Sequence, residues 1–226
     1  MGENAPRVAR RKELSGGEYV TGLLVESQRT NKHAYSEDFS LWTISFTDTS
    51  DAPAPAGIES DTYVVDAATA PDGTMTADAY DAGFEAFPYE HCFRQNVTTT
   101  AQRYTTSFFI KAGEKTTAMV RDRTLTNARA WINLSTCAAG TVGAGLLASK
   151  AEDYGNGWCR FSISYTATAA SQKIDVCATS ADNVTTYAET TGNGSNDMYV
   201  WGAQTVAIGS NLSGFVTSYI PSPSSD

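Results

Sequence analysis

The chain has 226 residues, of which 41% are hydrophobic and only 18% are charged, and this length suits one large domain. Its abundant Thr, Ser, Ala and Gly favour strands with a polar outer face over surface helices, which carry many Glu and Lys. The net charge of -9 excludes nucleic acid as the expected partner, because phosphates would be repelled, and no secretory signal or membrane span is visible.

The N-terminal part differs in charge from the rest. Residues 1–33 hold six Lys and Arg against four Asp and Glu, whereas residues 34–226 hold ten against twenty-one. The basic residues gather at Arg7, Arg10, Arg11 and Lys12. This cluster is either a solvated tail or an arm that docks on an acidic neighbour and becomes ordered on assembly.

Period-two alternation, which is typical of half-buried strands, recurs along the chain while helical periodicity is almost absent. Residues 158–165 place Cys159, Phe161, Ile163 and Tyr165 on one face, and Arg160 and two serines on a face expected to meet water. Residues 173–178 repeat the pattern, with Ile174, Val176 and Ala178 inward. Further strands are predicted at residues 104–111, 118–121, 130–134 and 198–204.

Turn signals rich in Gly, Asn and Pro separate these segments, as in a sandwich or barrel. Residues 47–62 contain two prolines and read as a long loop, and residues 81–95 show no clear period. We therefore predict an all-β fold, with an N-terminal arm at 1–33, a sandwich at 34–221 and a flexible tail at 222–226.

The four cysteines, Cys92, Cys137, Cys159 and Cys177, have no CxxC spacing, and the sequence cannot choose between the possible pairings. Since no signal peptide is visible, free buried thiols are expected.

Seven short blocks resemble, in the same order, segments of tailed-phage tail-fibre, head-fibre and decoration proteins. They are residues 21–31 (TGLLVESQRTN), 35–42 (YSEDFSLW), 70–78 (APDGTMTAD), 109–113 (FIKAG), 155–160 (GNGWCR), 199–204 (YVWGAQ) and 217–221 (TSYIP). The resemblance implies a jelly-roll sandwich of two antiparallel sheets with a short extended N-terminal arm, similar to family 4/9 carbohydrate-binding modules. It also implies a virion component, often a homotrimer, that meets the host surface.

Two departures from the family matter. Its members often follow long shafts, whereas about thirty residues precede the module here, which favours a head decoration protein or head fibre over a tail tip. The final GAQ is followed by residues 205–209 (TVAIG) instead of the family's acidic run, so a function of those carboxylates is not expected.

Catalytic groups are scarce. The histidines are His33 and His91, without a G-x-S-x-G motif or a pair at metal-ligand spacing. Acidic residues that could serve a glycosidase are abundant, but acidic loops are also simply solvated. The chain is therefore expected not to be an enzyme, and a glycan-depolymerising activity is the last alternative.

Sugar binding would need an exposed aromatic platform with polar neighbours. Trp42, Trp158 and Trp201 lie in the family blocks and are expected to pack between the sheets. Trp131 lies outside them, so Trp131 with Tyr104, Arg121 and Arg129 is the candidate surface for host polysaccharide.

The resemblance also implies a structural calcium ion near the first and last strands, with Glu37, Asp38 and Asp197 as candidate ligands, and turn and capping roles for these residues are the alternative. No other cofactor is expected.

The leading hypothesis is a non-enzymatic virion-surface protein, assembled in the host cytoplasm and attached to capsid or tail proteins through Arg7, Arg10, Arg11 and Lys12. A host-glycan-binding receptor protein is the alternative.

Overall fold

The computed structural model describes residues 7–12, 19–24, 29–47, 62–81, 90–185, 196–208 and 218–222. It divides into two compact units, Met1–Thr30 and Asn31–Asp226. In the first, β1 (Arg7–Lys12) pairs antiparallel with β2 (Tyr19–Leu24). The second unit begins at Asn31, three residues before the expected start of the sandwich at residue 34.

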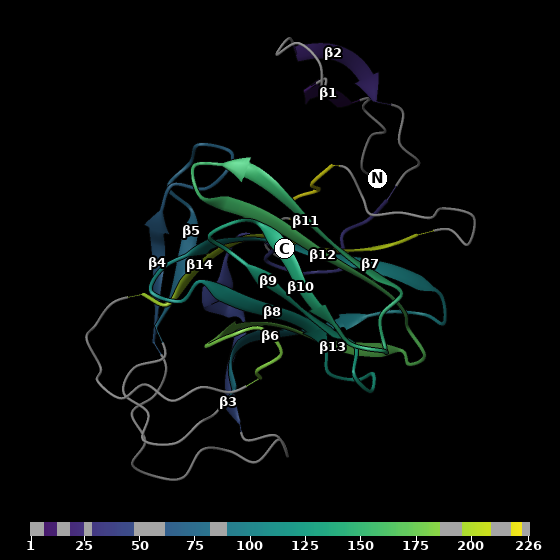
Figure 1. The fold of residues 1–226 in the computed structure, drawn as a ribbon. Helices are drawn as coiled ribbons and strands as arrows, with labels where there is room; N and C mark the ends of the chain where they lie inside the picture. The colour runs from purple at the N-terminus through teal and green to yellow at the C-terminus, as the bar shows by residue number, and fades with distance from the viewer. Residues whose placement is uncertain are drawn as a thin grey trace. The chain divides into compact units, whose positions relative to one another are not determined.

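The larger unit is a sandwich of two antiparallel six-stranded sheets, as predicted (Figure 1). Sheet I has the order β10-β9-β8-β13-β6-β3 and sheet II the order β11-β12-β7-β14-β5-β4. The strands of sheet I are β3 (Thr43–Thr47), β6 (Glu90–Thr98), β8 (Thr117–Asp122), β9 (Arg129–Asn133), β10 (Ala138–Val142) and β13 (Ser171–Thr179). Those of sheet II are β4 (Thr62–Ala68), β5 (Ala77–Asp81), β7 (Arg103–Ala112), β11 (Ala148–Gly155), β12 (Trp158–Thr166) and β14 (Met198–Ala207).

The predicted strands correspond to β7, β8, β9, β12, β13 and β14, and β8 pairs antiparallel with β9. A short 3-10 helix, η1 (Phe39–Leu41), precedes β3. Residues 48–61 of the predicted loop and residues 82–89 lie outside the described residues. The described part contains no helix long and apolar enough to cross a membrane.

The main core lies between the sheets. Phe161, Ile163 and Tyr165 of β12 point into it, as the alternation predicted, and Ile174 and Val176 of β13 do the same from sheet I. Each large apolar side chain buried here stabilises the fold by about 2–3 kcal/mol.

The outer face of sheet II is buried too, against expectation. Arg160 is 0% exposed and Ser162 is equally buried, so the prediction that they face water is wrong. Trp158 and Trp201 also lie on this face, in a second apolar cluster with Phe109, and only Trp42 packs in the main core as predicted. Side-chain alternation had identified which residues share a face without revealing what covers it.

The expectation of free thiols is wrong, because the structure pairs Cys92 with Cys177 and Cys137 with Cys159. Cys92 and Cys177 are directly opposite each other on the neighbouring strands β6 and β13, although 85 residues separate them. Only the register of the folded sheet brings them together.

Candidate functional site: the terminal clamp

The central feature of sheet II is a bulge in β14. The register between β14 and β7 shifts between Trp201 and Gln204, and Gly202 within the bulge has a φ of +63°. A Cβ atom on Gly202 would lie 2.8 Å from the Phe109 ring. The bulge therefore requires glycine for both its backbone angle and its space.

Replacing Gly202 by alanine is expected to lower the free energy of unfolding by about 2–4 kcal/mol, since left-handed strain adds to a ring clash. Gly155→Ala is the matched control, because Gly155 also has positive φ (+79°) but no heavy atom near its Cβ position. Urea unfolding of both variants measures the difference. An equal loss in the two would show that the Phe109 contact costs nothing.

The Asn31 side chain forms hydrogen bonds with the backbone of β14 at the bulge. Its Nδ2 donates to the carbonyl oxygens of Ala203 (2.8 Å) and Ile220 (3.0 Å), while its Oδ1 accepts from the backbone N–H groups of Thr205 (3.0 Å) and His33 (3.1 Å). All four hydrogen-bonding positions of this 8% exposed amide are used. One side chain thus joins residues 31–37, which we call the lead-in, to β14 and to residues 218–222, which we call the C-terminal segment.

A second set of hydrogen bonds joins Ser36 and Glu37 to β14 and to residues 219–222. The Ser36 carbonyl accepts from Ala203 N–H (2.8 Å), and its hydroxyl accepts from Ser222 N–H (2.9 Å) and lies 2.8 Å from the Tyr219 hydroxyl. Tyr219 donates to Glu37 Oε1 at 3.1 Å. Burial raises the pKa of Glu37, although the Tyr219 hydrogen bond opposes this. We call residues 31–37 and 218–222, together with the β14 bulge, the terminal clamp.

Arg160 of β12 contacts the clamp through its guanidinium group. Its Nη2 donates to Gln204 Oε1 (3.0 Å) and, at longer range, to Ser107 Oγ (3.3 Å) and the Ser218 carbonyl (3.4 Å). Its guanidinium carbon is 5.3 Å from the centre of the Phe109 ring, within cation–π range.

Aromatic rings complete this region. Trp201 and Tyr219 have ring centroids 4.8 Å apart, and both pack on Phe109. The indole N–H of Trp201 donates to Thr76 Oγ1 (3.1 Å), and that of Trp158 donates to the Thr69 carbonyl (3.0 Å).

Each of the seven sequence blocks contributes to this one region. The contributing residues, in chain order, are Asn31, Ser36, Glu37, Thr76, Phe109, Trp158, Arg160, Trp201, Gln204 and Tyr219. Blocks spread over almost two hundred residues therefore describe a single three-dimensional framework. No period in the sequence revealed this.

The expected sugar platform is not formed. Trp131 is 2% exposed and donates from its indole N–H to the Val184 carbonyl (2.7 Å). Tyr104 is 1% exposed and stacks on Tyr165 in sheet II, whereas the other three candidates lie on sheet I. Arg121 is also buried, and half-buried Arg129 places its guanidinium over the Trp131 ring. The prediction that this set is an exposed surface is wrong, because its members lie on two sheets and are largely covered.

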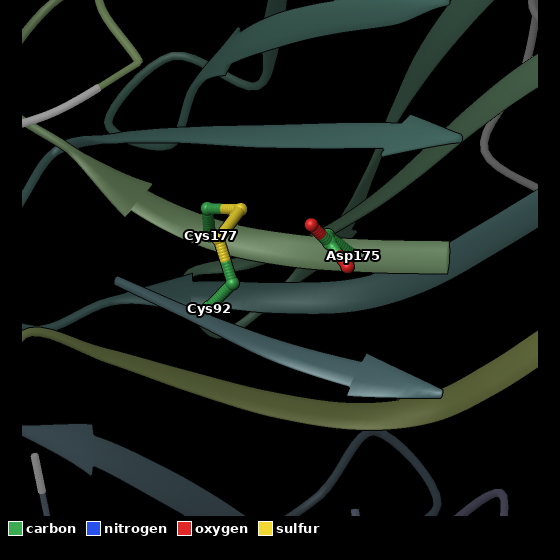
Figure 2. A group of neighbouring side chains, drawn as sticks. All are labelled: Cys92, Asp175 and Cys177. Atoms are coloured by element: carbon green, nitrogen blue, oxygen red, sulfur yellow. A yellow bond between two sulfur atoms is a disulfide. The ribbon is translucent and has the colours of Figure 1, made fainter. Parts of the chain in front are cut away.

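An ion-pair group that the sequence did not reveal lies on the outer face of sheet I. Asp175 is fully buried and is bound by Arg94 (Nε–Oδ1 2.7 Å) and Arg121 (Nη2–Oδ2 2.8 Å) from the two flanking strands. Asp175 also lies beside the Cys92–Cys177 disulfide, as Figure 2 shows. A polar residue inside the alternating pattern of residues 173–178 was the available signal.

Among the described residues, Cys92, Asp175 and Cys177 form the one set of three potential metal ligands whose atoms lie within 4.8 Å of one another. The two sulfur atoms are joined in a disulfide, which offers no thiolate, and both Asp175 oxygens bind guanidinium groups. The group therefore stabilises the sheet and does not have the chemistry of a metal site.

The calcium candidates are not gathered into such a set. Asp38 Oδ1 caps η1 by accepting from Ser40 N–H (3.1 Å), and buried Asp197 lies 3.7 Å from Lys115 Nζ. The nearby carboxylate of Asp78 accepts from the N–H groups of Phe39 (2.7 Å) and Asp66 (3.0 Å). A structural calcium ion stays a prediction.

Arg7, Arg10, Arg11 and Lys12 lie on β1 in the smaller unit. Their side chains are outside the described part of the structure, so their role in attachment also stays a prediction.

No protein-family model and no curated protein matches the chain. One solved structure that matches is the enzymatically active domain of tailspike protein 4 from bacteriophage CBA120, with 13% identity and a TM-score of 0.44. The match covers 79% of this chain and 21% of the tailspike chain. At this level of similarity it carries no argument about activity.

Proposed function

We propose that this chain is a non-enzymatic structural protein on the surface of a tailed-phage virion, on the head as a decoration protein or head fibre. The smaller unit, with basic β1, docks on a capsid protein, and the sandwich carries the exposed surface. The protein assembles in the host cytoplasm, and we infer a homotrimer that covers some of the sandwich's edge strands.

One observation carries this proposal. The seven blocks that resemble phage fibre and decoration proteins all supply residues to the terminal clamp or to the side chains around it. They are joined by hydrogen bonds from Asn31, Ser36, Arg160 and Trp201 and by the ring contacts of Phe109. A resemblance due to composition alone would not select residues that contact one another. The contacts among the blocks support the proposal that they belong to a framework common to such proteins.

Deleting residues 1–20 is expected to reduce incorporation into purified particles at least tenfold, because the deletion removes β1 and its basic residues. Full-length protein is the positive control, and a second variant with Arg7, Arg10, Arg11 and Lys12 changed to glutamine separates charge from length. Circular dichroism checks that the sandwich remains folded. Undiminished incorporation of the deletion variant would overturn the docking role.

A host-glycan-binding protein is the alternative, and a depolymerase is the more remote one. The burial of Trp131 and Tyr104 leaves the glycan alternative without the platform first assigned to it. Saturable binding on a host polysaccharide array, or release of sugar from that polysaccharide, would favour one of these over a purely structural role.

A further inference from the structure

A continuous chain of hydrogen bonds crosses the main core from the lead-in to β12. His33 Nδ1 lies 3.0 Å from Gln95 Oε1, and His33 Nε2 lies 2.9 Å from Thr205 Oγ1. Thr205 Oγ1 lies 2.6 Å from Thr106 Oγ1, which lies 3.0 Å from the Tyr165 hydroxyl. His33, Thr106, Thr205 and Tyr165 are all buried.

The hydrogen-bond partners determine which atom donates at each step of this hydrogen-bond chain. Gln95 Nε2 donates to the Ala34 carbonyl (2.8 Å) and its Oε1 accepts from Ala34 N–H (3.1 Å), which fixes the orientation of the amide. Its Oε1 can only accept, so His33 donates from Nδ1, and the neutral ring therefore accepts at Nε2. It follows that Thr205 donates to His33, Thr106 donates to Thr205, and Tyr165 donates to Thr106.

A second proton on His33 would oppose this order. Nε2–H would then donate to the Thr205 hydroxyl, and the proton of that hydroxyl would lose its acceptor. One hydroxyl of the hydrogen-bond chain (Thr205, or Tyr165 if every donation reverses) would be left without an acceptor in the core, where an unmade hydrogen bond is costly. Protonated His33 thus cannot keep the chain as it stands.

The surroundings of His33 offer no compensating anion among the described groups that contact it. Its ring stacks on Trp42 at 4.9 Å and also packs on Phe108 of β7, Gln95 comes from β6, and Thr205 comes from β14. The far end of the hydrogen-bond chain is Tyr165 of β12, which interacts electrostatically with Asp122 of β8 and Tyr104 of β7. Tyr104 in turn interacts electrostatically with Lys32. Asp122, whose charge raises the pKa of Tyr165, is buried at the far end, and its Oδ2 has no hydrogen-bond partner among the described residues.

We propose that His33 and its hydroxyl chain form an acid-sensitive latch, which holds residues 31–36 on β14 at neutral pH and releases them when His33 is protonated. These residues begin the larger unit, so the latch controls how firmly the first residues of that unit are held on the sandwich. In the closed state neutral His33 accepts a hydrogen bond from the Thr205 hydroxyl. The Lys32 N–H group also donates to the Thr205 carbonyl of β14, and the Ala34 N–H group donates to Gln95 Oε1.

Burial lowers the pKa of His33 from 6.5 to about 4. Protonation is therefore disfavoured while the latch is closed, and the stability of the closed state is full above pH 6.5 and lost as pH falls towards 4. Burial has the opposite effect on Asp122, raising its pKa to about 6, so its protonation stabilises the fold over part of the same window. A global unfolding curve would mix these two effects, and a local measurement is needed.

Hydrogen exchange of residues 29–36 tests the latch, with rates corrected for the intrinsic effect of pH. Between pH 7 and pH 4 we expect protection to fall by about a hundredfold, which is the change that this pKa difference implies. His33→Gln should remove this pH dependence, and Asp122→Asn should keep it. Protection that is unchanged at pH 4, or that falls equally in His33→Gln, would overturn the proposal.

An NMR titration of the wild-type histidines keeps the test independent of whether a variant folds. The proposal requires the His33 ring to titrate near pH 4 together with the loss of Lys32 and Ala34 amide protection. A His33 that titrates near 6.5, with both amides still protected, would also contradict it.

Discussion

Changing Asn31 to aspartate is expected to lower the free energy of unfolding by about 4 kcal/mol, the largest effect of a single substitution that we predict. The amide is almost isosteric with the carboxylate, so packing is retained. The variant loses both N–H donors, however, and turns an acceptor towards the Ala203 and Ile220 carbonyl oxygens. The clamp would be left with two unpaired carbonyls and a buried charge.

Asn133→Asp is the matched control. Asn133 is exposed, and its Oδ1 accepts from the N–H groups of Ser135 and Thr136, which a carboxylate can also do. We expect a change of at most about 0.5 kcal/mol there. Urea unfolding at pH 7 compares the two variants, and similar losses in both would show that the Asn31 bonds do not hold the clamp.

Removing the Cys92–Cys177 disulfide is expected to cost about 4 kcal/mol, and removing Cys137–Cys159 about 3 kcal/mol, because the first closes the longer loop in the unfolded chain (sequence separations of 85 and 22). Paired alanine variants, C92A/C177A and C137A/C159A, separate the two bonds. The first variant also leaves Met119 and Trp131 with a small cavity beside them, which adds to its loss.

A reducing agent supplies the control for cavity effects. Wild-type protein should lose stability when reduced, and each paired variant should lose only the contribution of its remaining bond. Two results would contradict both disulfide assignments: detection of free thiols in the folded, unreduced protein, or an unfolding midpoint that is the same with and without the reducing agent.

Local sequence pattern predicted the fold class, most of the central strands and their inward faces, because alternation depends only on neighbouring residues. It failed for Arg160, since period two says that Arg160 and Ser162 share a face but not that the C-terminal segment covers it. The prediction for Trp131 failed for a different reason. Its position outside the family blocks suggested exposure, while the fold places it under the Val184 carbonyl.

The features that define the candidate site depend on contacts between residues far apart in the sequence. Asn31 meets Ala203 and Ile220 across more than 170 positions, and Asp175 meets Arg94 through strand register. The block resemblance marked most of the clamp residues without saying that they touch. The hydrogen-bond chain through Thr106 and Thr205 could not be predicted from the sequence, because threonines are common throughout the protein.

Electron microscopy of intact particles labelled with a gold-conjugated antibody against this chain tests the proposed function most directly. We predict label distributed over the head surface, and its loss when the particles carry the variant that lacks residues 1–20. Label at the tail tip would contradict the head location. Unlabelled particles, with the protein found only in the soluble fraction of the lysate, would contradict the virion assignment itself.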